Sequence, residues 1–438
     1  AYKVWRESGE GREKFLEMIV KIQGVYVPSF YDVEYNEDNT IKSFAPNREG
    51  VPTKVKKRII KDLDNTYIPE KLIVPFMETV HDRIMLEVFR GCIRGCRFCQ
   101  AGYIYRPVRE RSVDRLVKTA ENAITATGYE EMSMSSLSTS DYTCLEELTN
   151  RLLDITVDKR INLSLPSLRV DNFSMELMEK VQKVKKSGLT FAPEAGTQRL
   201  RDVINKNVTE ADLLRTSKIA FGGGYNRMKL YFMLGLPTET DEDVLGIGEL
   251  ANRVIDSFYT LPPEERRGRS VSVTVSTSLF VPKPHTPFQW EPQNTIAELE
   301  RKASMLSRSI KNRKIVYNWH SSDVSFLEAV FAKGDRRLGE VLISACELGC
   351  KFDGWTDFFD FDKWLRAFEI HGIDPRFYAY RKIAYDEILP WDYADIGVSK
   401  DFMISEHEKA YRGETTSSCR EKCSACGAAQ FGGGVCFE

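Results

Sequence analysis

The sequence predicts an α/β fold in which six parallel strands form an open, partial barrel. Apolar and β-branched runs alternate with helical patterns from residue 84 to residue 312. Strands that alternate with helices in this way run parallel and are joined by right-handed crossovers. A closed barrel of this kind has eight strands, so six repeats predict an open one. The expected strands are 84–89, 131–136, 161–165, 188–193, 227–234 and 271–281.

Four regions are expected to follow one another along the 438-residue chain. They are an N-terminal extension or linker at 1–82, the barrel core at 83–291, a mostly helical region at 292–412 and a cysteine-rich tail at 413–438. The basic stretch 54–61 of the extension is interpreted as solvated surface. Amphipathic patterns predict helices at 113–127, 144–158, 174–187, 209–220, 240–257 and 296–312.

The composition is that of an ordinary globular protein, with 42% hydrophobic and 29% charged residues. The formal net charge of −2 gives no overall attraction to nucleic acid or to an anionic membrane. No apolar run reaches about 18 residues, so no membrane partner is expected. The start of the chain lacks the apolar core of a signal peptide. Because the first residue is not Met, we expect a fragment or a processed form.

Cysteines are the most informative residues of the chain. Seven of the ten fall into two tight groups, which favours metal binding in a reducing, cytoplasmic compartment over a disulfide framework. The first group, Cys92, Cys96 and Cys99, has C-x₃-C-x₂-C spacing and follows the strand predicted at 84–89. Three thiolates can ligate three irons of a cubane cluster and leave the fourth iron open for chemistry. A structural zinc site needs a fourth ligand, and no further Cys or His lies nearby in the sequence.

This motif, with Phe98 directly before its last cysteine, resembles the signature of the radical S-adenosylmethionine (radical SAM) enzymes. With the six strand–helix units, the resemblance extends over most of the chain. It implies a TIM-like partial barrel, a [4Fe–4S] cluster on Cys92, Cys96 and Cys99, and S-adenosylmethionine bound to the open iron through its amino and carboxylate groups. It also implies reductive cleavage to a 5′-deoxyadenosyl radical, with a reductant such as flavodoxin or ferredoxin as partner. In such enzymes the cofactor supplies the radical chemistry and the protein supplies position and potential.

Polar residues after the second and third predicted strands are candidates for binding the cofactor. Ser138 and Ser140 follow the second strand, where the resemblance places the methionine end, although the glycine-rich form of many members is missing here. An alternative is that these residues form an N-cap cluster for a helix that begins at Cys144. Arg169, after the third strand, is expected to pair with the cofactor carboxylate, because a guanidinium matches that group. The alternative for Arg169 is a surface salt bridge.

The ends of the next strands extend the resemblance. Glu194, in Glu194-Ala195-Gly196-Thr197, resembles the E-x-G-(S/T) segment of a subgroup that includes methylthiotransferases and cobalamin-dependent members. The resemblance implies that Glu194 accepts hydrogen bonds from the ribose hydroxyls. Gly235 and Leu236 belong to a segment resembling G-L-P-x-E-T, which implies close approach of the backbone to the ligand and packing of Leu236 on adenine.

Three further residues near the strand ends have structural interpretations. Thr197 is expected to cap the helix that follows it. Thr240, with Asp243, is typical of a capping box. His285 lies in a segment resembling P-x-P-x-T-P-F, and we interpret it as a structural loop histidine rather than a proton donor.

The tail carries the second cysteine group, which consists of Cys419, Cys423, Cys426 and Cys436. Four thiolates can fully ligate either zinc or a second cluster, and both remain open. We favour an auxiliary [4Fe–4S] cluster because the spacing of the first motif is repeated; a three-ligand cluster is a third alternative. The remaining thiols are expected to be packed rather than ligating: Cys144, Cys346 and Cys350.

Two functions of different class remain. The first is a radical SAM enzyme that modifies an unknown substrate by hydrogen abstraction or by methyl or methylthio transfer. The chain resembles a poorly characterised subgroup with a cobalamin-binding-like N-terminal domain; that domain is absent here, so cobalamin is expected only in a longer parent. The second is a metal-stabilised RNA- or ribosome-binding protein with a non-catalytic barrel. The net charge of −2 disfavours nucleic acid, whereas the basic stretch 106–115 favours it. No catalytic residue is assigned.

Overall fold

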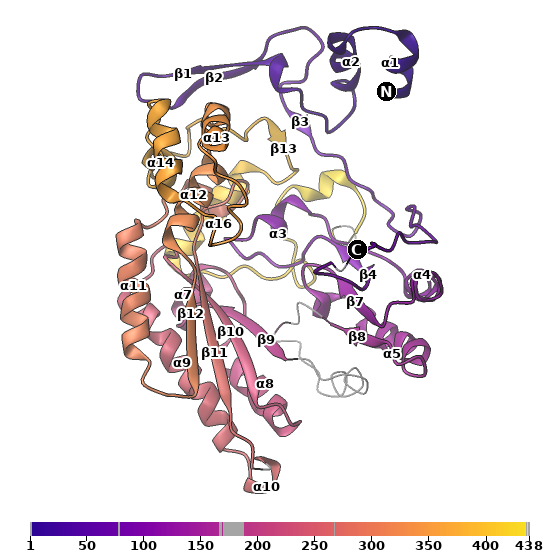
Figure 1. Ribbon diagram of the computed structural model, residues 1–438, viewed down its shortest axis with the longest axis vertical. Helices are drawn as coiled ribbons and strands as arrows, with labels where there is room; N and C mark the ends of the chain where they lie inside the picture. Colours follow the sequence, from indigo (N-terminus) through magenta and orange to yellow (C-terminus); the bar gives the residue numbers. More distant parts are fainter. Residues whose placement is uncertain are drawn as a thin grey trace.

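The computed structural model describes residues 2–77, 79–165, 169, 188–266, 268–434 and 436, and parallel strands form its centre (Figure 1). One sheet has the order β4–β7–β8 and the other the order β12–β11–β10–β9. All neighbours within these sheets pair in parallel. The α/β partial barrel expected from the sequence is confirmed. The strands are β4 (Ile84–Glu87), β7 (Glu131–Ser135), β8 (Asn162–Ser164), β9 (Leu189–Glu194), β10 (Arg227–Leu234), β11 (Ser272–Leu279) and β12 (Ile315–Trp319).

Strand β12 is an addition to the six strands that were predicted. It lies in the region 292–412, which was expected to be mostly helical. Its residues pair with β11 in a parallel register that runs from Val273↔Ile315 to Thr277↔Trp319. The run Ile-Val-Tyr-Asn-Trp contains β-branched and aromatic residues, which favour strands. The open barrel therefore has a seventh parallel strand, β12, next to β11, whereas six strands were predicted.

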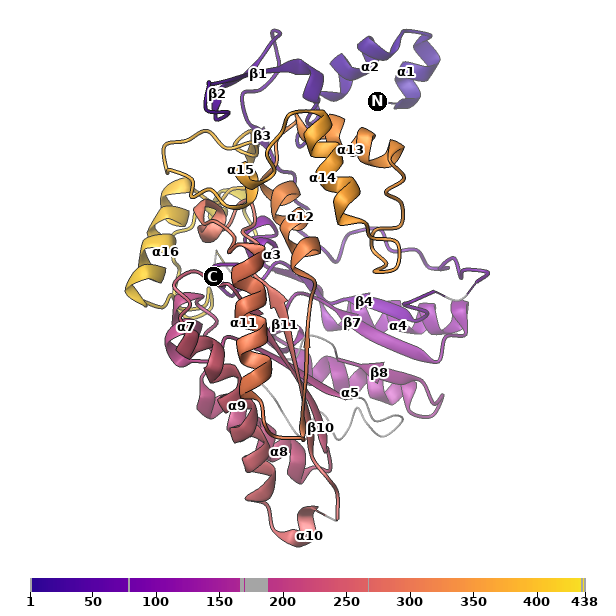
Figure 2. The same ribbon diagram turned by 60° about the vertical axis from the view of Figure 1, so that its left-hand side comes forward.

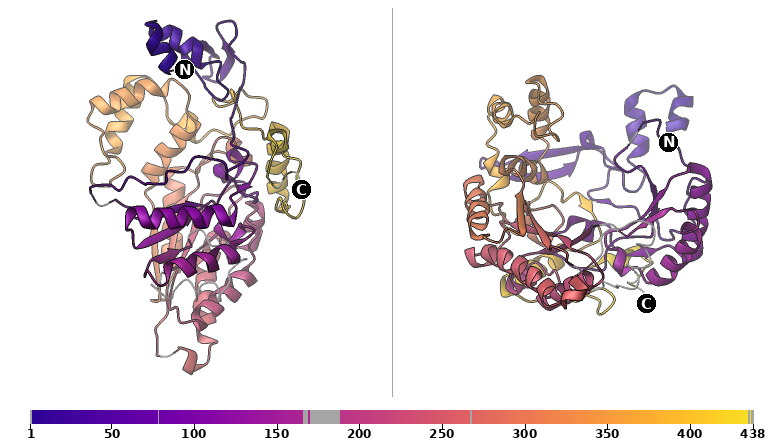
Figure 3. Two further views of the ribbon diagram at one scale, coloured as in Figure 1. Left: turned by 90° about the vertical axis from the view of Figure 1, so that its right-hand side faces the viewer. Right: turned by 60° about the horizontal axis from the view of Figure 1, so that its bottom comes forward.

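Helices cover the outer side of the curved sheets (Figure 3). In β10 every second side chain, Met228, Leu230 and Phe232, is buried in the main core cluster. The intervening Lys229 and Tyr231 are exposed, as the two-residue period of a strand requires. The helix pattern at 174–187 lies outside the described residues. The outer helices are α4 (Val113–Thr127), α5 (Leu145–Thr156), α8 (Glu210–Gly222), α9 (Asp241–Tyr259) and α11 (Ile296–Ser309).

Side-chain caps fix where several of these helices begin. Thr197 accepts a hydrogen bond from the backbone N–H of Leu200 at the start of α7 (Gln198–Val203), as predicted. Thr240 and Asp243 form the predicted capping box at the start of α9. These helices begin directly after β9 and after the loop that follows β10, so the caps also fix the strand ends that face the candidate site.

The N-terminal extension packs on the C-terminal region. It contains α1 (Tyr2–Ser8), α2 (Arg12–Ile19), the 3₁₀ turn η1 (Pro28–Phe30), the antiparallel hairpin β1 (Tyr31–Tyr35) and β2 (Ile41–Pro46), and β3 (Val55–Lys56). β3 pairs in parallel with β13 (Ala394–Asp395). The ring of Tyr26 stacks on Tyr393 with centroids 4.0 Å apart. The extension is thus joined to residues more than three hundred positions later in the chain.

Helices after β12 lie at the same end of the molecule as the extension (Figure 2). They are α12 (Ser322–Lys333), α13 (Leu338–Glu347), α14 (Phe361–Ile370), α15 (Arg376–Ala379) and α16 (Lys400–Arg412); a short α10 (Pro263–Arg266) precedes β11. Within the described residues, no helix has the length and apolar character that spanning a bilayer requires.

Candidate cofactor and metal site

The first cysteine group occupies the loop between β5 (Phe89–Arg90) and α3 (Gln100–Ile104). β5 pairs antiparallel with β6 (Arg109–Glu110), which closes the loop at its base. Gly91 has a φ of +91°, and a Cβ there would lie 2.8 Å from the carbonyl oxygen of Tyr105. Glycine is therefore required where the chain turns from the strand into the cysteine loop.

A buried arginine inside the motif fixes the loop against the rest of the protein. Arg97 has 0% exposure, and its side chain donates to the carbonyl oxygens of Val203 at 2.9 Å and Glu414 at 2.7 Å. Its Nη2 also lies 3.1 Å from Oε2 of Glu406 on α16. Because every partner is far away in sequence, the loop depends on α7, α16 and the tail for its position.

The three thiols of the loop interact electrostatically with one another and are partly shielded from solvent. Burial, followed by the neighbouring Cys96, raises the pKa of Cys92 to about 12, and the same two causes raise the pKa of Cys99. The backbone N–H of Arg94 lies 3.4 Å from Sγ of Cys92, a contact that suits a ligating sulfur. Within the described part of the chain, no three His, Cys, Asp or Glu side chains are already arranged around a metal position. By donor chemistry, three neighbouring thiols with an N–H donor to sulfur fit a thiolate-ligated iron site.

The loop after β7 is linked to the cysteine loop by an ion pair. Arg94 donates to both carboxylate oxygens of Asp141, at 2.9 and 2.5 Å, and Ser138 donates to Asp141 at 2.6 Å. Burial alone would raise the pKa of Asp141, but Arg94 and Ser138 outweigh it and hold the pKa below its usual range. The predicted site residue Ser138 is therefore linked to the cysteine loop through Asp141.

The alternative role of these serines as a helix cap is wrong. α5 begins after Cys144, which makes no side-chain capping hydrogen bond. Residues Thr139–Asp141 instead form a separate 3₁₀ turn, η2. Ser140 accepts a hydrogen bond from the backbone N–H of Arg169 at 3.2 Å. The side chain of Arg169 donates to the carbonyl oxygen of Lys206 at 3.0 Å, so Arg169 joins the ends of the second and third strands to residues 205–207.

Glu194 ends β9 with a φ of +70° and faces the cysteine loop. Its Oε1 lies 3.0 Å from Nζ of Lys206, and both side chains are mostly buried, with 16% and 13% exposure. Both residues interact electrostatically with Cys99. Burial lowers the pKa of Lys206, but Glu194 and Cys96 outweigh it, so the pKa is raised. Lys206 was not predicted as a site residue, although it stands in the Asn205-Lys206-Asn207 run that contacts the loop.

Leu236 and Phe98 meet in one apolar cluster, which also contains Phe280 and Phe288. The structure thus places the aromatic residue of the cysteine motif in the same apolar cluster as the residue expected to pack on adenine. Gly235 has a φ of +84°, and a Cβ there would lie 2.8 Å from Leu299 of α11. Glycine is therefore required at position 235 because the backbone has a positive φ and packs closely against α11.

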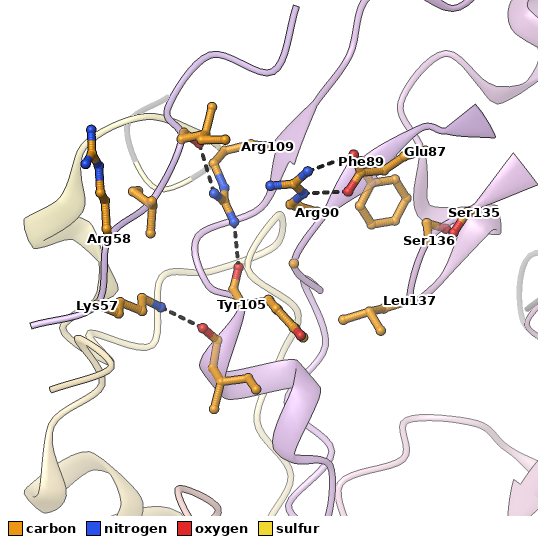
Figure 4. Close-up of a pocket in the computed structure, with 14 residues that line it drawn as sticks. Lys57, Arg58, Glu87, Phe89, Arg90, Tyr105, Arg109, Ser135, Ser136 and Leu137 are labelled. Carbon is orange, nitrogen blue, oxygen red and sulfur yellow. Dashed lines mark hydrogen bonds and ion pairs between the residues drawn. The ribbon is translucent and has the colours of Figure 1, made fainter. Parts of the chain in front are cut away.

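A cleft of about 680 Å³ opens beside the cysteine loop, between the extension and the ends of β4 and β7 (Figure 4). Arg90 on its wall pairs with Glu87, and Arg109 donates to backbone carbonyls, including that of Tyr105 at 3.1 Å. The cleft reaches Gly91 and Ser136, which precede Cys92 and the η2 turn respectively. The cleft therefore borders the segments that lead into the cysteine loop and the η2 turn.

Lys57, from the basic stretch 54–61, and His285, from the loop after β11, interact electrostatically. Nζ of Lys57 donates to the carbonyl oxygens of Ile104 and Arg106 at 2.8 and 2.7 Å, so the interpretation of Lys57 as solvated surface is wrong. Burial, then Lys57, lowers the pKa of His285 to about 4. His285 is consequently neutral near pH 7, which agrees with its interpretation as a structural loop residue.

The tail returns to the first cysteine loop. The backbone N–H of Cys419 donates to the carbonyl oxygen of Ile93 at 3.0 Å. Cys426 is 7% exposed, and Cys436 interacts electrostatically with the three other tail thiols. The two cysteine groups therefore occupy neighbouring positions. Of the thiols expected to be packed, Cys144 and Cys350 lie against core clusters, whereas Cys346 is exposed, contrary to expectation.

Comparison with known families gives a match to one model. Residues 86–251 match the Radical SAM superfamily, a segment that contains the end of β4, the cysteine loop and the strands from β5 to β10. The uncharacterized protein MJ0966 of Methanocaldococcus jannaschii is 32% identical over 303 residues, which are 67% of this chain and 63% of that protein. A second protein of the same archaeon, named "Putative methylthiotransferase MJ0865", is 24% identical over 48% of this chain and 49% of its own. The chain therefore spans less than two thirds of either relative.

Solved structures give weaker similarity. The cobalamin- and [4Fe–4S]-bound methyltransferase TsrM from Kitasatospora setae is 16% identical, with a TM-score of 0.34, over 44% of this chain and 36% of that one. The cobalamin-dependent enzyme OxsB has a TM-score of 0.37 at 10% identity, over 75% and 54% of the two chains.

Proposed function

Because residues 86–251 of this chain match the model of the radical SAM superfamily, we propose that the protein is an enzyme that cleaves S-adenosylmethionine reductively to modify a further substrate. A [4Fe–4S] cluster with S-adenosylmethionine, when bound, supplies the electron transfer that releases a 5′-deoxyadenosyl radical. The observation that carries the proposal is the meeting of the ends of β5, β7, β9 and β10 around Cys92, Cys96 and Cys99. Hydrogen abstraction and methyl or methylthio transfer are the proposed reactions.

Each candidate site residue is assigned one role in this proposal. Cys92, Cys96 and Cys99 hold the cluster, and Phe98 and Leu236 form an apolar wall that excludes water from it. Ser138, Ser140 and Arg169, at the ends of the second and third strands, orient the polar end of the cofactor. Glu194, held by Lys206, accepts hydrogen bonds from its ribose, and Gly235 shapes the wall beside Leu236.

The substrate entrance, the electron donor and the second metal site are proposed from the chemistry of the residues and of the reaction. The cleft beside Gly91 and Ser136 is the proposed substrate entrance. An external electron donor, such as flavodoxin or ferredoxin, is required because the chain's side chains cannot supply the electron. A reducing cytoplasm suits the free thiols. The tail cysteines Cys419, Cys423, Cys426 and Cys436 are proposed as a second metal site, for an auxiliary cluster or zinc.

The test is anaerobic reconstitution with iron and sulfide, followed by reduction in the presence of S-adenosylmethionine. We expect a brown protein that produces 5′-deoxyadenosine or S-adenosylhomocysteine. The triple variant Cys92→Ala/Cys96→Ala/Cys99→Ala should lose both products. The matched control is Cys346→Ala/Cys350→Ala, which removes two thiols of the C-terminal region and should retain activity. Wild-type protein that bound iron in this loop but neither bound nor cleaved the cofactor would exclude the proposal.

A further inference from the structure

The side chain of Arg106 lies between the two cysteine groups and is almost fully buried, with 3% exposure. Nη2 donates to the carbonyl oxygen of Arg94, in the first cysteine loop, at 2.9 Å. Nε donates to the carbonyl oxygen of Gly102 at 3.0 Å. Nη1 is buried and takes part in neither of these bonds, while the guanidinium also forms a hydrogen bond with the side chain of Cys426. A permanently charged group is therefore enclosed against a thiol of the tail, which is unfavourable unless an anion compensates the charge.

The acidic groups that interact electrostatically with this guanidinium are first the phenol of Tyr103, and then the thiols of Cys419 and Cys426. Cys436 interacts in turn with these two thiols, with Cys423 and with Arg106. As neutral thiols these groups do not compensate a charge. As ligands they are thiolates, and four thiolates around Zn²⁺ or around a [4Fe–4S]²⁺ core carry a net charge of about −2. Metal binding in the tail would thus supply the anion that Arg106 lacks.

The surroundings of the tail are built to hold it at this place. A Cβ on Gly434 would lie 1.8 Å from the carbonyl oxygen of Val108, so the backbone of the tail rests directly on the segment after Arg106. Lys57, which donates to the Arg106 carbonyl, also lies 4.8 Å from the ring centroid of Phe431. Lys56 donates to the side chain of Gln430 at 2.8 Å. Two lysines of the extension therefore add positive charge on the outer side of the tail.

We propose that Cys419, Cys423, Cys426 and Cys436 bind a thiolate-ligated metal centre for which Arg106 is the buried counter-cation. Through its contact with the Arg94 carbonyl, Arg106 also ties this centre to the first cysteine loop. The inference rests on the proposed second metal site and adds the residue that stabilises it. Arg106 is a positioning residue, because it acts through the metal ligands and through the loop backbone.

The experiment uses the full chain with the first site removed, so that metal at the tail is measured alone. In Cys92→Ala/Cys96→Ala/Cys99→Ala protein, iron, sulfide and zinc per chain are determined after anaerobic reconstitution. We expect about one zinc or about four irons with sulfide, and loss of this metal on adding Cys419→Ala/Cys423→Ala/Cys426→Ala. Iron with sulfide identifies a cluster and zinc identifies a zinc site; either supports the proposal. Absence of bound metal overturns it, whether or not the wild-type protein cleaves S-adenosylmethionine.

The role of Arg106 is tested in the same background. Arg106→Gln removes the charge and should weaken retention of the tail metal against a chelator about tenfold or more, the effect typical of second-layer partners of metal ligands. Arg106→Lys keeps the charge and should restore most of the retention. Arg109→Gln is the matched control, because Arg109 is 5% exposed and donates to three backbone carbonyls. Equal retention in Arg106→Gln and Arg109→Gln, with both folded by circular dichroism, would show that Arg106 has no such role.

Discussion

The ion pair between Arg97 and Glu406 should contribute a large share of the stability of the cysteine loop. Their side chains have exposures of 0% and 1%, and the Nη2–Oε2 distance is 3.1 Å. Replacing Glu406 with Gln keeps the shape but leaves the charge of Arg97 without its anion. Removing one partner of a buried pair costs about 3–5 kcal/mol. Because Gln still offers one acceptor oxygen, we expect Glu406→Gln to lower the free energy of unfolding by about 3 kcal/mol, at the lower end of this range.

The assay is urea denaturation of the metal-free protein near pH 7, followed by tryptophan fluorescence. The matched control is Glu369→Gln, which breaks the pair of Glu369 with Arg366, whose side chains are 69% and 60% exposed. Exposed pairs contribute about 0–1 kcal/mol, so this control should unfold almost like the wild type. If Glu406→Gln were no more destabilising than Glu369→Gln, the loop would not depend on this pair.

The same pair has a pH signature. Burial would raise the pKa of Glu406, but Lys409, Thr416 and Arg97 outweigh it, so the pKa is lowered in the folded protein. A carboxyl group with a lowered pKa stabilises the fold above its unfolded pKa, and that stabilisation is lost as the pH falls through the folded value. The difference in stability between wild type and Glu406→Gln should therefore be constant near neutrality and shrink below about pH 4.

Three further outcomes are expected. Gly91→Ala adds a Cβ 2.8 Å from a carbonyl oxygen, at a residue whose φ is positive. We therefore expect a lower melting temperature and a lower iron content of the reconstituted protein. Unchanged iron content would show that the turn adapts. Glu194→Gln should keep the iron but weaken equilibrium binding of S-adenosylmethionine about tenfold, because a charged acceptor is lost; unchanged affinity would remove Glu194 from the ribose site. Thr240→Ala should cost about 1 kcal/mol in urea denaturation through loss of the cap of α9, and a neutral result would mean that Asp243 alone suffices.

The strand order and the cysteine loop were accessible to sequence reasoning because their signals are local. Alternation in β10 and β11, and the caps at Thr197 and Thr240, depend on residues a few positions apart. Strand β12 was missed because a five-residue run after a helix gives too short a pattern to separate strand from loop.

The contacts that hold the site together could not be predicted, because they join distant segments. Arg97 meets Glu406, and Lys57 reaches the carbonyl oxygen of Arg106 across 49 positions of sequence. Nothing in the local pattern around Lys57 distinguishes it from the exposed Lys54. Lys206 is likewise recognised only through Glu194, its neighbour in space. The candidate ligands and the cation Arg169 were thus predicted from the sequence, but the buried cations Arg97 and Lys206 were not.

The dependence of the cysteine loop on the tail has a consequence for synthesis of the protein. The strands from β4 to β11 leave the ribosome in the order in which they pair, so most of the sheet can form during translation. Arg97, however, can form its contacts with Glu406 and Glu414 only after these residues have been synthesised. The same holds for the hydrogen bond between the Ile93 carbonyl oxygen and the N–H of Cys419. The cysteine loop therefore takes its final form only after the tail has been made. Delivery of iron to this protein is accordingly expected to follow translation rather than accompany it.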